Sequence, residues 1–207
     1  MTKNRPYLLA IESAIAGGSV ALFNGNEFVS GKSGAQAISR AEDLVPNVND
    51  LLKEANVPKS DLARIAVSLG PGSYTGLRIG LASVMGLARG LDIEYIGVPL
   101  FAAIATCFPQ AVAFALPMGK TDICFTLAGE TGKPSVATSS TLLENSQFAA
   151  ATPIGVHADL MLPLGELGAL NLIDIGRNLA QYVGTASLNR PASRNLEAIY
   201  VQNPRFG

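Results

Sequence analysis

The central segment of the chain is Gly70-Pro71-Gly72-Ser73-Tyr74-Thr75-Gly76-Leu77-Arg78-Ile79-Gly80. It follows the apolar, partly β-branched run Arg64–Leu69, which predicts a buried strand. It leads into Leu77–Leu91, whose content of Leu, Ala, Ile, Val and Met predicts a helix. The central segment is therefore predicted to be a glycine turn between a strand and a helix.

The turn has residue types that an anion can approach. Gly70 and Gly72 leave the backbone bare and can adopt a positive φ, and Pro71 restricts the chain between them. Ser73 or Thr75 can accept a hydrogen bond from the free N–H groups of the first helical turn. Those N–H groups and the positive end of the helix dipole favour negative charge. The residues predicted to face an anion or nucleotide here are Gly70, Gly72, Ser73, Thr75 and Gly76.

The predicted helix after the turn is rich in small residues. They recur at helical spacing, as Gly76, Gly80 and Ser83 on one face and Ala82, Gly86 and Gly90 on another. Small residues at this interval let a second backbone approach closely. The apolar run is too short to span a bilayer, so we expect a tightly packed helix of a soluble protein.

Ahead of the turn, the chain predicts three strands and a helix. The strands are Tyr7–Ile11, Ser19–Phe23 and Glu27–Val29, separated by short turns, which indicates an antiparallel meander. Ser39 and Glu42 have the spacing of a capping box. Pro46 lies in the first turn of the following helix or kinks it. The apolar positions of that helix are Leu44, Val48, Leu51, Leu52 and Ala55.

Behind the central helix, Tyr95–Val98 predicts a strand and Leu100–Phe108 a short apolar helix with Pro99 at its start. A meander followed by alternating helices and strands predicts an α/β fold with a mixed sheet. The second half predicts strands at Ala111–Leu116, Asp122–Leu127, Pro134–Thr138 and Pro153–Val156, and helices at Thr141–Ala151 and Leu172–Val183. We place the boundary between two lobes at 1–105 and 106–207.

Composition narrows the class of protein. With 207 residues, of which 48% are hydrophobic and 15% charged, the chain can form one large domain or two small ones. A formal net charge of −1 argues against an extended nucleic-acid surface. Glu12 ends the first apolar run before it reaches the length of a signal peptide, and no convincing spanning helix follows. Cys107 and Cys124 lie in apolar surroundings, which predicts buried, reduced thiols and a cytoplasmic protein.

Leu69–Gly80 resembles the signature of the TsaB (YeaZ) family, the non-catalytic partners of TsaD in the synthesis of threonylcarbamoyladenosine in tRNA. Leu8–Ser13 with Ser19–Leu22, Leu44–Pro46 and Ile96–Val98 also resemble that family, in the same order. The resemblance runs from about Tyr7 to Ala105, with an echo in Tyr200–Asn203. It implies the two-lobed ASKHA fold of actin-like ATPases, with mixed sheets flanked by helices.

The same resemblance implies a function. The chain is expected to be an accessory subunit that pairs with and activates a TsaD-like catalytic subunit acting on position 37 of ANN-decoding tRNA. It is expected to have no catalytic residue, metal or cofactor of its own, with ATP and a metal on the partner subunit. A TsaE-like ATPase is a further expected partner, tRNA contact is indirect, no membrane is involved, and the chain alone is expected to form a homodimer.

Two predicted helices offer a partner surface. Two apolar helices, one of them rich in glycine, can form a helical bundle with a similar pair. The alternative is an internal helix pair that covers one face of the sheet, as most apolar helix faces do. The residues of the predicted partner surface are Leu44, Val48, Leu51, Leu52, Gly80, Ser83 and Gly86.

Glu12 leaves two interpretations. In ATPases that resemble this fold, an acidic residue on the first strand helps to hold magnesium and nucleotide, and a self-sufficient ATPase using Glu12 and Gly70–Gly76 is the rival function. However, one carboxylate rarely holds Mg²⁺ without phosphate or a second carboxylate. The other interpretation is a hydrogen-bonded carboxylate that braces the turn after the strand. Ala41-Glu42-Asp43 and Leu116-Pro117-Met118-Gly119 depart from the family pattern by losing polar groups, which puts a ligand role for those segments in doubt.

Three short patterns imitate catalytic motifs. Gly31-Lys32-Ser33 and Gly119-Lys120-Thr121 match the end of a P-loop, but each lacks the glycine required five residues before its own glycine. His157 is the one histidine, with Asp159 two residues later and no local nucleophile signature. It is either a structural histidine or the base of a peptidase.

Overall fold

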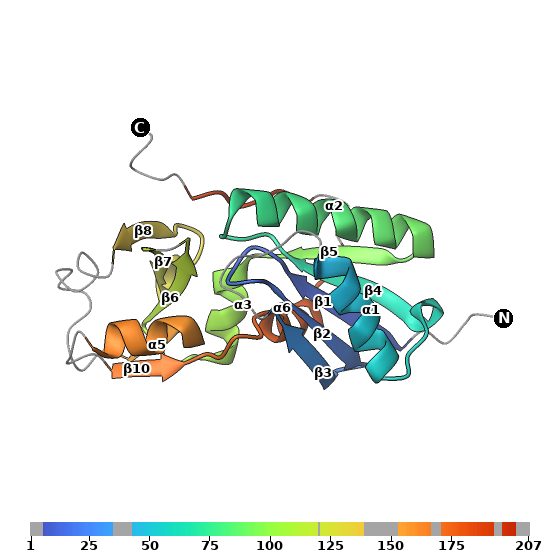
Figure 1. The fold of residues 1–207 in the computed structure, drawn as a ribbon, viewed down its shortest axis with the longest axis horizontal. Coiled ribbons are helices and arrows are strands. Elements are labelled where there is room, and N and C mark those ends of the chain that lie inside the picture. Colours follow the sequence, from blue (N-terminus) through green and yellow to red (C-terminus); the bar gives the residue numbers. More distant parts are fainter. Residues whose placement is uncertain are drawn as a thin grey trace.

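The structure of the protein is a computed structural model that describes residues 6–34, 43–119, 121–138, 153–166, 171–192 and 196–201. The described residues form two five-stranded sheets with helices packed around and between them (Figure 1). The first sheet has the strand order β3-β2-β1-β4-β5. Its strands are β1 (Tyr7–Glu12), β2 (Ser19–Asn24), β3 (Glu27–Ser33), β4 (Leu62–Ser68) and β5 (Glu94–Val98).

The second sheet repeats the topology of the first. Its strand order is β10-β9-β6-β7-β8. In each sheet the first three strands form an antiparallel meander, and two later strands are added in parallel beside the first strand. The strands are β6 (Ala113–Met118), β7 (Asp122–Leu127), β8 (Ser135–Thr138), β9 (Pro153–Val156) and β10 (Asn171–Asp174).

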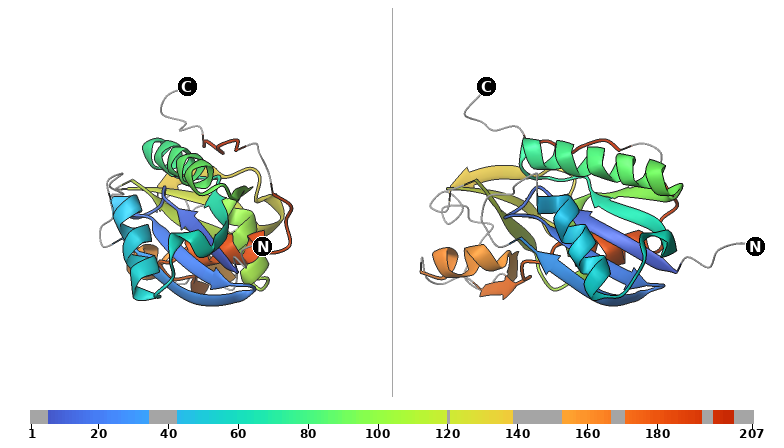
Figure 2. Two further views of the ribbon diagram at one scale, coloured as in Figure 1. Left: turned by 90° about the vertical axis from the view of Figure 1, so that its right-hand side faces the viewer. Right: turned by 45° about the vertical axis from the view of Figure 1, so that its right-hand side comes forward.

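Helices cover both faces of the first sheet, as the two views of Figure 2 show. On one face lie α1 (Leu44–Glu54) and α2 (Tyr74–Leu91), and on the other lie α3 (Leu100–Cys107) and α6 (Ala180–Ser187). The helix α5 (Ala158–Gly165) packs on β6 and β10 of the second sheet. Short 3₁₀ turns, η2 (Lys59–Asp61) and η3 (Ala128–Glu130), precede β4 and follow β7.

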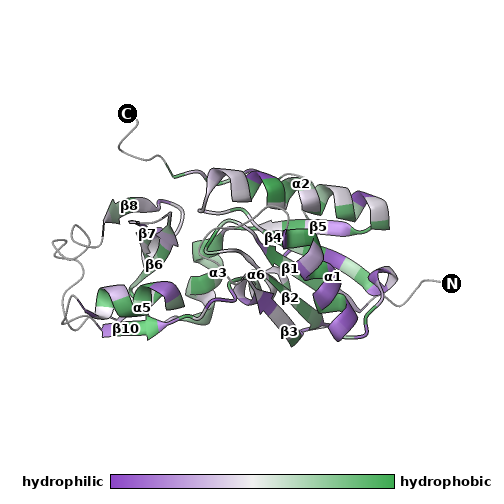
Figure 3. Ribbon diagram, in the orientation of Figure 1, coloured by the Kyte–Doolittle hydropathy of each residue, from purple (hydrophilic) through white to green (hydrophobic). Residues whose placement is uncertain are grey.

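The central strand β1 is buried on both faces. Leu9 and Ile11 pack towards α1 and α2, whereas Leu8 and Ala10 pack towards α3 and α6. This explains why its sequence is a continuous apolar run without polar alternation, as is usual for a strand covered by helices on both sides. Figure 3 shows the same distribution, with hydrophobic colour on α3 and mixed colour on α1.

The predicted elements of the first half are found, with shifts at their ends. The central helix begins at Tyr74, three residues before the predicted start, because Ser73 caps it. Pro46 lies in the first turn of α1 and does not kink it, since that turn needs no backbone N–H there. The predicted capping box of Ser39 and Glu42 lies outside the described residues. Asp43 takes the N-cap position of α1 without a side-chain hydrogen bond.

The predicted helix Leu172–Val183 is wrong. Its first residues form β10, which pairs in parallel with β9, and only the last part belongs to α6. Gly176, with φ of +73°, separates the two elements. Ile175, Leu179 and Val183 are all buried, so the apolar spacing is real but arises from a strand end, a turn and a helix. The helix α5 was not predicted, and the predicted helix Thr141–Ala151 lies outside the described residues.

The second half of the chain also completes the first lobe. The helix α6 packs on β1, β2 and β4 of the first sheet and on α3. Gly184 lies against the ring of Phe23, closer than a residue with a Cβ atom would allow. The boundary between residues 105 and 106 falls inside α3 and stays a prediction. Within the described ranges, no helix is both long and apolar enough to cross a membrane.

Candidate functional site

The glycine turn joins β4 to α2 and needs glycine for two different reasons. Gly70 has a φ of +97°, in the region that favours glycine. Gly72 has no positive φ, so the unusual backbone that the sequence allows at both glycines occurs only at Gly70. Instead, a Cβ atom at Gly72 would overlap the methyl group of Ala14 and lie 3.1 Å from that residue's carbonyl oxygen. The turn is therefore packed directly against the segment that follows β1.

The first turn of α2 is capped by Ser73 and hydrogen-bonded to the segment that follows β1. Ser73 Oγ accepts a hydrogen bond from the backbone N–H of Gly76 (3.1 Å), which identifies Ser73 rather than Thr75 as the cap. The backbone N–H of Ser73 donates to the carbonyl oxygen of Ala14 (3.0 Å). The hydroxyl of Ser13 donates to the carbonyl oxygen of Gly76 (2.8 Å). Thr75 is exposed.

Gly76 and Gly80 face this same segment inside the molecule. A Cβ atom at Gly76 would lie 2.5 Å from the carbonyl oxygen of Ser13, and one at Gly80 would overlap the Ser13 hydroxyl. One predicted small-residue face therefore brings α2 close to the β1–β2 turn. Gly80 is buried there, so its predicted place in a partner surface is corrected to an internal contact.

The Glu12 side chain ends β1 and is fully buried. Its Oε1 accepts hydrogen bonds from the backbone N–H groups of Ala14 (2.6 Å) and Ile15 (3.1 Å). Its Oε2 has no hydrogen-bond partner among the described residues. Burial raises the pKa of Glu12 from 4.5 to about 8, against the two backbone hydrogen bonds, which lower it. At neutral pH the side chain is therefore a neutral carboxylic acid that braces the turn.

A small cavity lies beside Glu12. Its volume is about 10 Å³, which is close to the least that one water molecule needs. A nucleotide or a hydrated magnesium ion does not fit this space. The residues that line it are Glu12, Ser13, Gly17, Gly18, Ser19, Val20, Leu44 and Asn47.

The apolar face of α1 is not a free surface. Val48 is 3% exposed and packs in one core with Leu9 and Ile11 of β1. The reason is the ordinary one for an amphipathic helix, because its apolar stripe covers the sheet. The predicted partner residues Leu44, Val48, Leu51 and Leu52 are all buried, so this part of the predicted interface is corrected to core.

The outer face of α2 is exposed. A Cβ atom at Gly86 or Gly90 would meet no atom within 4 Å. Met85, on the same face, is 46% exposed, and Ser83 is partly exposed. Of the predicted partner residues, Ser83 and Gly86 are therefore the ones that a second molecule can reach.

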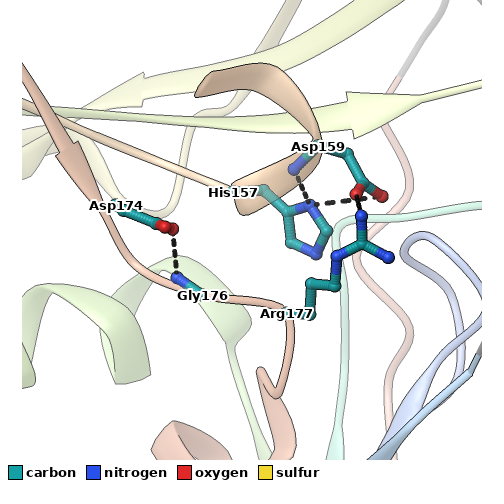
Figure 4. Close-up of polar contacts among 5 residues, drawn as sticks. All are labelled: His157, Asp159, Asp174, Gly176 and Arg177. Atoms are coloured by element: carbon teal, nitrogen blue, oxygen red, sulfur yellow. Dashed lines mark hydrogen bonds and ion pairs between the residues drawn. The ribbon is translucent and has the colours of Figure 1, made fainter. Parts of the chain in front are cut away.

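His157 stands at the start of α5, where β9 ends (Figure 4). Its Nδ1 accepts a hydrogen bond from the backbone N–H of Asp159 (3.2 Å), so His157 is the N-cap of α5. The Asp159 carboxylate pairs with Arg177 (2.5 Å). Burial is the main cause that lowers the pKa of His157, with Arg177 acting in the same direction and Asp159 and Asp174 against it. The geometry is that of a structural histidine.

The two P-loop fragments do not lie in phosphate-binding loops. Gly31-Lys32-Ser33 belongs to β3, and Lys32 Nζ bonds Glu54 Oε1 at 2.6 Å. Gly119 and Thr121 lie in the turn between β6 and β7, and Lys120 is outside the described residues.

Cys107 and Cys124 are free thiols, Cys124 buried and Cys107 only partly so. Burial raises the pKa of both, that of Cys124 to about 12. In the part of the chain that the structure describes, no three His, Cys, Asp or Glu residues are grouped to hold a metal ion.

A cluster of two tyrosines and an arginine at the turn is not indicated by any sequence pattern. The rings of Tyr74 and Tyr200 lie 5.1 Å apart, and the Arg78 guanidinium lies 3.9 Å from the centre of the Tyr74 ring. The segment that carries Tyr200 is joined to the end of β4 by a hydrogen bond from the Ile199 N–H to the Leu69 carbonyl oxygen (2.7 Å). Tyr74 and Tyr200 are far apart in the sequence, so no local pattern indicates this contact.

Part of the chain is similar to known proteins of tRNA threonylcarbamoyladenosine synthesis. The family model described as TsaD, tRNA N6-adenosine threonylcarbamoyltransferase, matches residues 37–119. The tRNA threonylcarbamoyladenosine biosynthesis protein TsaB of Escherichia coli (strain K12) is 34% identical over 98 residues, 47% of this chain and 42% of that protein. TsaB of Bacillus subtilis (strain 168) is 41% identical over 61 residues, 30% of this chain and 27% of that protein. The aligned stretches thus span less than half the length of these curated relatives.

A solved structure extends the likeness over nearly the whole chain. An uncharacterized protein with similarity to peptidase YeaZ, from Pseudomonas aeruginosa, gives a TM-score of 0.62 at 22% identity, covering 95% of this chain and 98% of that one. At this identity the likeness concerns the fold. Together with the sheet topology, it confirms an α/β fold with two mixed sheets flanked by helices.

Proposed function

We propose that this chain is a TsaB (YeaZ)-like protein and takes part in the synthesis of threonylcarbamoyladenosine in tRNA, on the strength of its similarity to TsaB proteins. In the proposed role it is an accessory subunit that pairs with and activates a TsaD-like catalytic subunit. The modified nucleoside is position 37 of ANN-decoding tRNA. Residues 37–119, which the TsaD family model matches, contain the glycine turn and α2, and these support the proposal most directly.

The buried state of Glu12 is the single observation that carries the accessory role. In an ATPase of this fold, the acidic group on the first strand would have to reach a metal or a nucleotide. Here it is neutral at pH 7, bonded to its own turn and enclosed beside a cavity of about 10 Å³. The proposal therefore assigns nucleotide, metal and threonylcarbamoyl transfer to the partner subunit, with tRNA contacting this chain indirectly.

The outer face of α2 is the proposed contact with the TsaD-like subunit. It offers the exposed glycines Gly86 and Gly90 beside the apolar side chain of Met85. Glycines on a helix surface let a partner helix approach closely, and Met adapts to an irregular neighbour. The same face would form a homodimer when the partner is absent. A TsaE-like ATPase and a cytoplasmic location belong to the same proposal.

A reconstituted modification assay tests the function. Purified chain, a TsaD-like subunit and the remaining components are combined with unmodified tRNA, and the modified nucleoside is measured. We expect product only when this chain is present. Equal product without it would exclude the accessory role.

A substitution on α2 tests the contact. We expect Gly86→Arg to weaken the complex at least tenfold, because a long charged side chain replaces an open glycine. Gly165→Arg is the matched control, since Gly165 is likewise an exposed helical glycine with no atom near its Cβ position, but in the second lobe. Equal affinity of the two variants, measured by titration calorimetry, would place the contact elsewhere.

A self-sufficient ATPase remains the rival function and is tested separately. Nucleotide titration and phosphate release are measured on the isolated chain and on Glu12→Gln. Under the accessory proposal neither protein hydrolyses ATP. Hydrolysis by the native chain that the variant loses would instead favour the ATPase.

A further inference from the structure

The Glu12 carboxyl group has one oxygen whose hydrogen bonding the described residues do not complete. Oε1 is bonded to the backbone N–H groups of Ala14 and Ile15, and Oε2 is buried with no partner among the described residues. A buried polar atom without a partner is costly, and native proteins rarely keep one without water or another group beside it.

Neither protonation state of Glu12 supplies the missing hydrogen-bond partner of Oε2. An ionised carboxylate needs a donor at Oε2, whereas a protonated one needs an acceptor for the hydrogen it carries there. A water molecule can act as either. The cavity against which Glu12 lies has a volume of about 10 Å³, close to the smallest space that accommodates one water. Asn47 and the backbone of Gly17 and Gly18 line the same cavity and offer the water further polar partners. Ser19 also lines it, but its hydroxyl oxygen already accepts a hydrogen bond from the Ala180 N–H (2.9 Å).

We propose that this cavity binds one ordered water, and that the water, Glu12 and the turn Ser13–Ile15 form a proton-dependent latch that seats the first turn of α2. The remaining links are hydrogen bonds between this turn and the glycine turn. Ser13 Oγ donates to the Gly76 carbonyl oxygen (2.8 Å), and the Ala14 carbonyl oxygen accepts from Ser73 N–H (3.0 Å). The carboxyl group that holds Ala14 and Ile15 therefore also sets the position of the glycine turn.

Among the residues that the structure describes, Glu12 is the only ionisable one that lines the cavity. The elements around it carry other charges, but none of them contributes to the pKa shift of Glu12, whose causes are burial and two backbone hydrogen bonds. The charged side chains on these elements are Glu27 and Lys32 on β3, Asp43 before α1, Asp50, Lys53 and Glu54 on α1, Arg64 on β4, and Arg78 and Arg89 on α2.

The sign of the pH effect follows from the two states. Burial raises the pKa of Glu12 to about 8 in the folded chain from an ordinary 4.5. Between these values the folded chain holds a proton that the unfolded chain has released. The stability of the folded chain therefore falls as pH rises through this window. The loss of stability that Glu12 causes is complete above about pH 8. Above it, the latch contains a buried negative charge whose main new partner is the water.

The first test measures stability against pH. Urea unfolding midpoints are recorded from pH 5 to 9 for the native chain, Glu12→Gln and Glu27→Gln. Gln cannot ionise, and its size is nearly that of the protonated Glu. We expect the midpoint of the native chain and of Glu27→Gln to fall with rising pH relative to Glu12→Gln. Parallel curves for all three proteins would overturn the latch.

The second test does not depend on any variant folding. Carboxyl ¹³C resonances of the native protein are titrated by NMR, and a crystal structure at high resolution is determined near pH 6.5. We expect one glutamate to titrate well above the ordinary range, and one water hydrogen-bonded to Glu12 Oε2. All glutamates titrating near pH 4.5, or an empty cavity with Oε2 still unbonded, would overturn the proposal.

Discussion

At the scale of single residues, a few atoms around Ala14 set the geometry of the glycine turn. Gly70 is needed for its positive φ, whereas Gly72 is needed for the space that a side chain would take. The sequence indicates both glycines but not this difference, because Ala14 is far from the turn in sequence and is brought there by the pairing of β1 with β4. Glu12 likewise could be identified as an acidic group after the first strand, but its burial depends on residues from several elements.

Gly72→Ala is expected to destabilise the protein by about 1–3 kcal/mol, the usual cost of overpacking. The added methyl would overlap that of Ala14 and press on backbone that is itself hydrogen-bonded to Ser73. Gly86→Ala is the control, since its Cβ position is open, and it should be neutral or stabilise the helix by up to about 1 kcal/mol. Thermal unfolding of both variants checks this, and equal melting temperatures would show that the Gly72 contact yields easily.

His157 is expected to make stability depend on acid pH. Burial lowers its pKa below the ordinary 6.5, so the unfolded chain binds a proton first. The stability is therefore present above about pH 6.5 and is lost as pH falls below it. Protonation also removes the Nδ1 acceptor that caps α5.

His157→Asn offers a capping oxygen that does not titrate. Unfolding midpoints between pH 5 and 7.5 should fall with acid in the native chain and stay flatter in the variant. Identical slopes would assign the acid sensitivity to other groups.

At the scale of elements, the spacing of apolar residues predicts that a helix has an apolar face, but not what packs on that face. The spacing Leu44, Val48, Leu51, Leu52 correctly predicts a helix, and the same spacing suits a partner surface or a sheet. Only the fold decides, and it places the stripe on the first sheet. The failure at Leu172–Val183 has a similar origin, because four apolar residues at helical intervals cross from a strand through a glycine turn into a helix.

Val48→Glu is expected to prevent folding or to cost at least about 3 kcal/mol, because it buries an unpaired charge. Val45→Glu is the matched control on the same helix, where the native side chain is 43% exposed. Circular dichroism and urea unfolding of both variants decide between core and surface. A folded, stable Val48→Glu protein would show that the apolar face of α1 is a partner surface and not core.

At the scale of the whole molecule, the two sheets share one topology, although the sequence reveals no repeat. Burial preserves the type of residue at each strand position, not its identity, so the duplication is visible in strand order alone. The two halves are also tied together by α6, which belongs to the second half in sequence and to the first sheet in packing.

A chain that ends at Asn178 is expected to lose cooperative folding, because it lacks the helix that buries Phe23, Ala180 and Val183 in a shared core. A chain that ends at Val201 retains every described element and is the control. Both are examined by thermal unfolding. A cooperative transition in the shorter chain would show that the two sheets fold without α6.

The position of α6 late in the sequence also affects how the chain folds during its synthesis. A ribosome delivers β1 to β5 first and Ala180–Ser187 only after β10, so one apolar face of the first sheet lacks the cover of α6 throughout translation of the second sheet. During that interval, a chaperone or a protease meets strands that the finished protein never exposes. Slowing elongation after residue 110 should therefore lower the yield of native protein more than slowing it before β4.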